Sequence, residues 1–194
     1  MIPFTNRTFY IESYGCTYNH ADAEKLADIA RKQGCRQVDT AEEADVVIIN
    51  TCTVIASTER AMLRRIRACA HKNLVVTGCL PVVQMDAIAA VSSPVVIPPD
   101  AITAASGRIG AVIQPGTGVL QIAKGCLGAC SYCLTRFARG RLASFSERAI
   151  LAEAERLIAE GACELQLTGQ DVSAYGRDTG TDLPSLLGAL GDLA

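Results

Sequence analysis

The chain has 194 residues, of which 49% are hydrophobic and 20% are charged, and its formal net charge is −2. This length and composition allow a sizeable buried core and exclude a globally disordered chain. The slightly acidic balance also excludes a uniformly basic nucleic-acid-binding module. A nucleic-acid partner would have to use a local patch or a segment outside these residues.

The cysteine content indicates a reducing compartment. Nine cysteines are an odd number, which argues against a complete disulfide framework. The N-terminus lacks a signal-peptide pattern, and no apolar run approaches the roughly 20 residues that a membrane span needs. We therefore expect a cytoplasmic protein without a membrane partner.

Short apolar runs alternate with helical patterns through the first half of the chain. The expected strands are Thr8–Ser13, Asp45–Asn50, Leu74–Thr77 and Pro94–Ile97. The expected helices are Ala21–Gln33 with Asn19 as its N-cap, Ser57–Ala70, and a third from Pro81 to about Ala90. This order predicts an α/β fold in which residues 1–108 form a doubly wound, flavodoxin-like parallel sheet.

A second alternating series follows a stretch rich in glycine. We interpret residues 109–118 as a linker because they contain Pro115 and several glycines. Residues 119–194 then predict strand Val119–Ala123, helix Ser146–Glu160, strand Glu164–Thr168 and a final helix near Leu183–Leu193. These are two β/α units, whereas a complete eight-unit barrel takes about 250 residues. We therefore expect a fragment of a longer protein.

Six of the cysteines fall into two sets of three. The dispersed set, Cys16, Cys52 and Cys79, follows the ends of three predicted strands. In open parallel sheets, ligands bind beyond the carboxyl ends of the strands, so these thiols are expected to meet at one edge. The alternative is three independent buried thiols, because free cysteine is common in protein cores.

The compact set lies in one loop, with the spacing C-x3-C-x2-C at Cys126, Cys130 and Cys133. Three thiolates this close can bind three corners of one [4Fe–4S] cluster and leave its fourth iron open. The alternatives are a structural zinc site, which usually takes four ligands, and a ferredoxin-like electron carrier, which supplies four cysteines per cluster.

This compact motif, with Tyr132 before its last cysteine, resembles the radical S-adenosylmethionine superfamily. The segments Tyr14-Gly15-Cys16, Asn50-Thr51-Cys52-Thr53-Val54 and Thr77-Gly78-Cys79 narrow the resemblance to the tRNA and ribosomal-protein methylthiotransferases. Cys133–Ser144 and Leu167–Asp178 look most like the branch that acts on threonylcarbamoyladenosine in tRNA.

The resemblance implies two [4Fe–4S] clusters and S-adenosylmethionine as cofactors. It assigns the compact cysteines to the radical-generating cluster and the dispersed cysteines to a second, sulfur-carrying cluster. It places Tyr132 beside the adenine of S-adenosylmethionine, and Gln170 and Asp171 follow the second barrel strand, where they can help to hold that cofactor. Loop capping is an equally good interpretation of Gln170 and Asp171. No catalytic residue is expected beyond the cluster ligands.

The implied reaction inserts a methylthio group at C2 of the modified adenine next to the anticodon. The implied partners are tRNA, bound largely by segments beyond these residues, and an electron donor such as flavodoxin or ferredoxin, with no role for DNA. We expect these residues alone to bind clusters without completing turnover. The alternatives are another methylthiotransferase branch, a two-cluster electron carrier and a zinc-stabilised interaction module.

A basic helix face at Arg60, Arg64, Arg65 and Arg67 is either a contact for RNA phosphates or a solvated surface.

Overall fold

A computed structural model describes residues 5–53 and 56–193, so Val54 of the predicted motif lies outside the described residues. The chain divides into two compact units, Met1–Gly107 and Arg108–Ala194, and each is described by itself. Among the described residues, no helix combines the length and the apolar character that crossing a membrane requires.

The first unit is built on a sheet of five parallel strands in the order β2-β1-β3-β4-β5. The strands are β1 (Thr8–Ser13), β2 (Arg36–Gln37), β3 (Val46–Thr51), β4 (Asn73–Gly78) and β5 (Val95–Val96). The chain reverses its direction of winding between β1 and β3, which is the flavodoxin-like order and its switch point. The predicted α/β fold class is confirmed.

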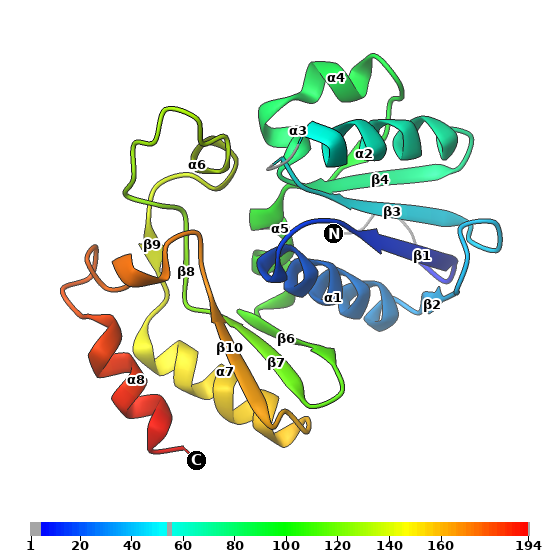
Figure 1. Cartoon of the computed structure of the whole chain (residues 1–194). Coiled ribbons are helices and arrows are strands. Elements are labelled where there is room, and N and C mark those ends of the chain that lie inside the picture. The colour runs from blue at the N-terminus through cyan, green and yellow to red at the C-terminus, as the bar shows by residue number, and fades with distance from the viewer. Residues whose placement is uncertain (1–4, 54–55, 194) are drawn as a thin grey trace. The chain divides into compact units, whose positions relative to one another are not determined.

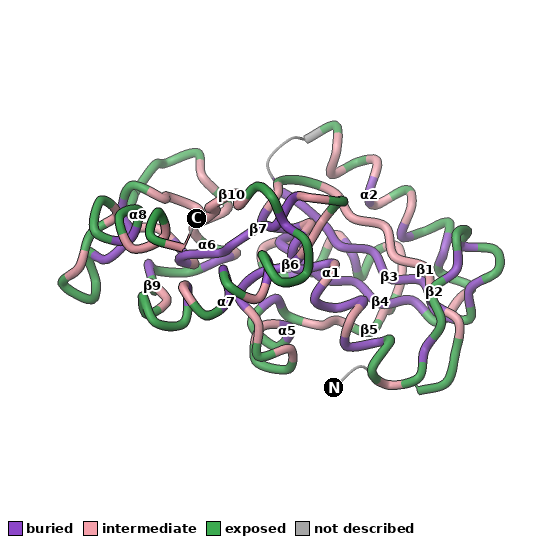
Figure 2. The backbone as a smooth tube through the Cα atoms, turned by 90° about the horizontal axis from the view of Figure 1, so that it is seen from below, coloured by how far each residue is buried: buried purple, intermediate pink, exposed green. Residues whose placement is uncertain are grey.

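Helices cover both faces of this sheet (Figure 1). On one face lie α1 (Thr17–Lys32) and α5 (Pro99–Ser106), and on the other lie α2 (Ala56–Ala68), α3 (Leu80–Val83) and α4 (Met85–Ala89). Successive residues of β3 alternate between the two hydrophobic cores, which is why every residue of this strand is buried (Figure 2). A buried ion pair between Lys25 and Asp22 adds a polar contact to α5, because Lys25 Nζ lies 3.3 Å from Thr103 Oγ1.

Two predicted helices differ from the observed ones. The first helix begins at Thr17 with Cys16 as its N-cap residue, so the prediction of Asn19 as the cap is wrong. Asn19 lies inside the helix because its amide is used elsewhere, as described below. The predicted helix from Pro81 to Ala90 is two short helices, because Gln84 adopts a non-helical backbone with φ −143° and ψ 45°.

The second unit contains a three-stranded sheet in the order β10-β7-β6. Its strands are β6 (Gly110–Gln114), β7 (Thr117–Gln121) and β10 (Glu164–Thr168), and β7 and β10 are parallel. Helix α7 (Glu147–Ala159) crosses between them, and α8 (Leu183–Gly191) follows β10 after the short turn η1 (Val172–Ala174). The predicted pair of β/α units is therefore present. A small antiparallel ladder pairs β8 (Ala123–Lys124) with β9 (Ala143–Ser144), and the segment between these strands contains the cysteine loop and α6 (Thr135–Arg139).

The predicted linker at residues 109–118 is wrong in its structure. Most of this segment is β6 and the start of β7, which pair as an antiparallel hairpin. Pro115 and Gly116 form the hairpin turn, in which Gly116 has φ +79°. The predicted strand from Val119 to Ala123 also starts two residues earlier, at Thr117. The hairpin packs onto the core of the second unit through Ile109 and Val112.

Candidate metal centres

The three dispersed cysteines lie at one edge of the parallel sheet. Cys52 and Cys79 directly follow β3 and β4, whose last residues are paired in register, Thr51 with Gly78. The backbone N–H of Cys79 donates to the carbonyl of Thr51, with an N···O distance of 3.0 Å. Cys16 follows β1 at the start of α1, and β1 pairs with β3 up to its last residue. The predicted placement at the carboxyl ends of the strands is therefore observed.

Two glycines let the cysteine segments approach each other. A Cβ on Gly15 would lie 2.8 Å from Cys52 Sγ, and a Cβ on Gly78 would lie 2.1 Å from the carbonyl oxygen of Thr51. Both glycines have positive φ values, +103° and +88°, which other residues rarely adopt. Any side chain at either position would push the segments of Cys16, Cys52 and Cys79 apart.

Two buried asparagines, Asn19 and Asn50, connect these segments, and we call them the asparagine clamp. Asn19 Nδ2 donates to the carbonyl oxygens of Tyr14 (3.0 Å) and Thr51 (2.7 Å), which belong to the two segments that carry Cys16 and Cys52. Asn50 Nδ2 donates in turn to the carbonyl of Asn19 (2.6 Å) and to Ser13 Oγ (3.1 Å). The clamp thus fixes the end of β1 against the end of β3.

Unsatisfied polar atoms lie beside the clamp. Asn50 Oδ1 and Thr53 Oγ1 are buried and have no hydrogen-bond partner among the described residues. A Cβ on Gly78 would lie 2.6 Å from Asn50 Oδ1, so this oxygen faces the backbone that leads to Cys79. Buried polar atoms are rarely left unpaired in proteins, and their clustering at this edge indicates a site that accepts a further group.

A carboxylate behind this edge holds the Tyr14 side chain. Glu12 accepts hydrogen bonds from Tyr14 Oη and from Arg65 Nε of α2, the latter at 2.8 Å. Burial raises the pKa of the Tyr14 phenol, and the hydrogen bond to Glu12 raises it further. Tyr14 is therefore neutral at physiological pH and acts as a fixed donor beside Gly15 and Cys16.

The compact cysteine loop runs from Gly125 to Cys133, between β8 and α6. Gly125 has φ +72°, and a Cβ there would lie 2.0 Å from the carbonyl oxygen of Arg141. Cys126 N donates to the carbonyl of Gly140 at 3.2 Å, which closes the base of the loop. Gly128 N donates to Cys126 Sγ at 3.1 Å, so a backbone N–H already points at the first thiol sulfur. Such N–H···S contacts stabilise negative charge on cysteine sulfur.

The three predicted cofactor-binding residues, Tyr132, Gln170 and Asp171, differ in their contacts and exposure. Gln170 Oε1 accepts from Gly125 N at 2.5 Å, so this side chain holds the base of the cysteine loop. Asp171 Oδ1 accepts from Ser173 Oγ at 2.7 Å within its own turn. Both contacts match the loop-capping interpretation of these two residues. Tyr132 is 86% exposed at the tip of the loop.

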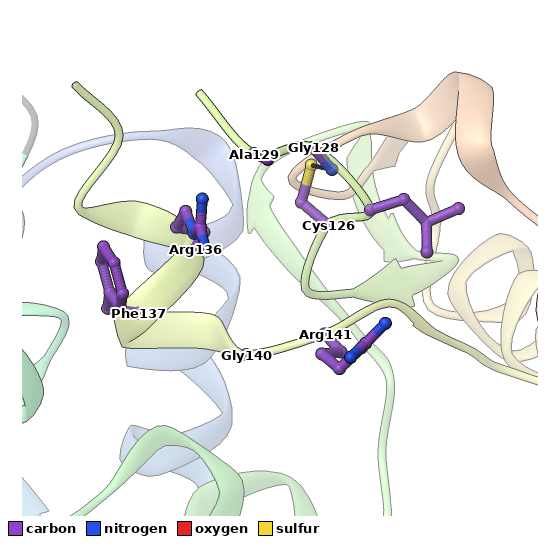
Figure 3. A pocket seen from close by; sticks show the side chains of 8 residues that line it. Cys126, Gly128, Ala129, Arg136, Phe137, Gly140 and Arg141 are labelled. Atoms are coloured by element: carbon purple, nitrogen blue, oxygen red, sulfur yellow. Dashed lines mark hydrogen bonds between the residues drawn. The ribbon is translucent and has the colours of Figure 1, made fainter. Parts of the chain in front are cut away.

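A cavity of about 320 Å³ opens next to Cys126. Arg136 and Phe137 from α6 form one side of it and Arg141 lines its base, while the loop from Cys126 to Ala129 forms the opposite side (Figure 3). The guanidinium of Arg136 lies 4.8 Å from the centre of the Phe137 ring. An anionic group and a flat ring are the ligand features that this lining suits. Phe137, which is 63% exposed, was not among the sequence-predicted site residues.

The donor sets fit clusters better than single ions. All nine cysteines are free thiols. Across residues 5–53 and 56–193, no three His, Cys, Asp or Glu side chains converge on one point as ligands of a single ion do. In an iron–sulfur cluster each thiolate binds a different iron, so the three sulfurs of a set need not converge. Soft thiolates, glycine-lined segments and an N–H directed at sulfur are the features that such clusters use.

The first unit is matched by a known family model. Residues 8–97 match the family described as "Uncharacterized protein family UPF0004". This matched segment lies within the first unit and includes all three dispersed cysteines.

Curated relatives extend the similarity to both units. The chain is 36% identical to a probable threonylcarbamoyladenosine tRNA methylthiotransferase of Methanothermobacter thermautotrophicus, over 92% of this chain and 48% of that protein. It is 32% identical to the threonylcarbamoyladenosine tRNA methylthiotransferase of Xenopus laevis, over 96% of this chain and 39% of that protein. The resemblance predicted from the cysteine motifs is thus confirmed. The chain spans about half the length, or less, of the curated relatives that it matches.

One solved structure has a similar fold. A radical S-adenosylmethionine methyltransferase from Kitasatospora setae, TsrM, solved with cobalamin and a [4Fe–4S] cluster bound, aligns with a TM-score of 0.53 at 13% identity. The alignment covers 91% of this chain and 51% of that one. This likeness concerns the fold, which agrees with a parallel-sheet unit followed by β/α units.

Proposed function

We propose that this chain provides the cluster-binding portion of a tRNA methylthiotransferase. The proposed substrate is threonylcarbamoyladenosine next to the anticodon, and the proposed reaction inserts a methylthio group at C2 of its adenine by radical S-adenosylmethionine chemistry. The observation that carries the proposal is the pair of separate thiol triads, each at the carboxyl ends of strands. The names of the relatives support the same reaction class.

The proposal assigns each triad to one [4Fe–4S] cluster. Cys126, Cys130 and Cys133 would hold the first, and Cys16, Cys52 and Cys79 would hold the second. Bound there, the clusters supply the electron for cleavage of S-adenosylmethionine and the sulfur for insertion.

The protein's own groups position the reactants at the compact site. Arg136 and Arg141 offer guanidinium groups to a carboxylate or phosphate in the cavity, and Phe137 offers an apolar surface. Gln170 acts indirectly, because its side chain holds Gly125 and so the base of the cysteine loop. Tyr132 lies at the exposed tip, where the proposal places it against the adenine of S-adenosylmethionine.

The partners belong to the same proposal. They are tRNA, with much of its binding surface in residues beyond these, and a one-electron donor such as flavodoxin or ferredoxin. The proposed location is the cytoplasm, a reducing compartment in which thiols stay free of disulfides. The proposed assembly does not require DNA or a membrane.

The test begins with iron and acid-labile sulfide analysis of the anaerobically reconstituted chain. We expect about eight iron atoms per chain, the content of two [4Fe–4S] clusters. Replacement of either cysteine triad by alanine should leave about four. The matched control is Cys163→Ala, because Cys163 is an exposed thiol outside both triads. It should leave the iron content unchanged.

Reduction in the presence of S-adenosylmethionine then separates the alternatives. Formation of 5′-deoxyadenosine that requires the compact triad supports a radical enzyme. Iron and sulfide without 5′-deoxyadenosine would instead indicate an electron carrier, and zinc without sulfide would indicate a structural metal module. Methylthiolation assays with tRNA, in a protein that contains the remaining length of the relatives, identify the branch. Activity only on isopentenyladenosine or on a ribosomal protein would contradict the proposed substrate.

A further inference from the structure

Three arginines form a stripe along α2. Arg60, Arg64 and Arg67 are exposed and are separated by four and three residues, so they lie along one side of the helix. Arg65 is not part of this stripe, because it forms an ion pair with Glu12, in which Arg65 Nε lies 2.8 Å from Glu12 Oε2. Of the carboxylates that the structure describes, none forms an ion pair with the three stripe arginines.

These arginines surround a shallow groove of about 230 Å³, with Leu63 and Val91 as its remaining lining residues. We call this surface the α2 arginine groove. Its apolar residues are partly buried, whereas its three arginines are exposed. A groove with this lining suits an anionic partner that also has an uncharged, flat or apolar part.

Helix stability does not explain the stripe. Like charges three and four residues apart repel one another and weaken an isolated helix. Basic residues are favourable in the last turn of a helix, which accounts for Arg67 but not for Arg60 in the first half of α2. The rest of the chain offsets this local charge, since the formal net charge is −2. The three exposed guanidinium groups therefore give this surface a local positive charge on a chain that is slightly acidic as a whole.

We propose that the α2 arginine groove binds the phosphate backbone of tRNA. The proposal rests on the proposed function, because that function makes tRNA the substrate. Along the helix axis, Arg60 and Arg64 are about 6 Å apart, and Arg64 and Arg67 are about 4.5 Å apart. A row of cations with this spacing suits the successive phosphates of one RNA strand. Arginine binds phosphate in a bidentate manner, and Leu63 and Val91 offer an apolar surface for a ribose or base.

The test measures the salt dependence of tRNA binding. Anisotropy of a labelled, unmodified tRNA transcript gives the Kd of the cluster-loaded chain at salt concentrations from about 50 to 200 mM. For the triple variant Arg60→Gln/Arg64→Gln/Arg67→Gln, we expect weaker binding and a plot of log Kd against log salt that is shallower by about two to three. The matched control, Lys32→Gln/Arg36→Gln/Arg148→Gln, removes the same charge from exposed positions elsewhere and should keep the original slope.

The outcomes separate this inference from the proposed function. An unchanged slope in the arginine variant, or no binding of tRNA by the parent chain at low salt, overturns the groove assignment. If the variant instead loses binding of a reduced acidic flavodoxin and keeps its tRNA slope, the groove binds the electron donor and the inference is also overturned. Iron content and formation of 5′-deoxyadenosine require no tRNA, so these two measurements detect failure of the proposed cluster and radical chemistry independently of the groove assignment.

Discussion

The asparagine clamp should make a large contribution to the stability of the sheet edge that carries Cys16 and Cys52. Replacement of Asn19 by alanine removes a partly buried hydrogen bond to the carbonyl of Tyr14 and a buried one to the carbonyl of Thr51. The carbonyl of Thr51 still accepts a hydrogen bond from Cys79 N, so losing its hydrogen bond from Asn19 costs about 1 kcal/mol. The carbonyl of Tyr14 loses the hydrogen bond from Asn19 without a replacement, which costs about 1–3 kcal/mol. The higher helix propensity of alanine returns about 0.5 kcal/mol. The expected net destabilisation is about 1.5–3.5 kcal/mol.

Hydrogen exchange of the β1 and β3 amides measures this effect locally. A loss of about 1.5–3.5 kcal/mol corresponds to opening that is roughly 10- to 400-fold more frequent. The matched control is Asn73→Ala at the opposite end of the sheet, which removes one exposed hydrogen bond to Asp45 O and should change exchange far less. The variant Asn19→Ala should also lose iron from the dispersed triad while the compact triad keeps its own. Equal effects of the Asn19 and Asn73 substitutions on exchange would refute the reasoning.

Three further predictions concern the compact loop. In Gly125→Ala, the new Cβ would lie 2.0 Å from the carbonyl oxygen of Arg141. We therefore expect iron analysis to show loss of about half of the bound iron, and full retention of iron would contradict the close packing at Gly125. Gln170→Ala should release iron faster to a chelator because Gly125 N loses its acceptor, whereas Gln170→Glu retains an oxygen and should restore slow release. Hydrogen bonds from Ser144 hold the pKa of Asp178 in the folded protein below its usual value. The ionised carboxylate therefore stabilises the fold above its unfolded-state pKa of about 3.9. This contribution disappears as the pH falls through the lower folded-state pKa. Urea midpoints of Asp178→Asn should therefore be lower than those of the parent chain near pH 7 and converge with them once the pH falls below the lowered folded-state pKa of Asp178. A difference that persists in acid would contradict this assignment.

Much of the fold could be predicted because its signals are local. The apolar run that ends at Asn50 and the cysteine that follows predicted both a buried strand and a functional edge. Local composition is less informative about residues 109–118, where a turn rich in glycine and proline connects the strands of a hairpin. Pro115 and Gly116 have the composition of a linker, and only the pairing of β6 with β7 shows that they connect two strands.

The positions of the cysteines at the candidate sites could be predicted from the sequence, whereas the residues that support them could be predicted less well. The spacing of the cysteines carries information about clusters, whereas the role of Asn19 depends on contact with Thr51, 32 residues away. One signal was available, since a polar Asn50 at the end of an apolar strand must find partners when buried. Gln170 was singled out for its place at the end of a strand, but a single sequence does not reveal that its oxygen binds Gly125.

The attachment of the compact loop determines how far its motif can be transplanted. Cys126 to Cys133 is contiguous in sequence, yet Gln170 holds its base from 45 residues away, and Asp178 holds β9 through Ser144. A peptide that ends shortly after the last cysteine would contain every thiol and neither of these contacts. The smallest transferable piece of this protein therefore extends from β7 through Asp178, and a graft of the cysteine motif alone would lack the geometry described above.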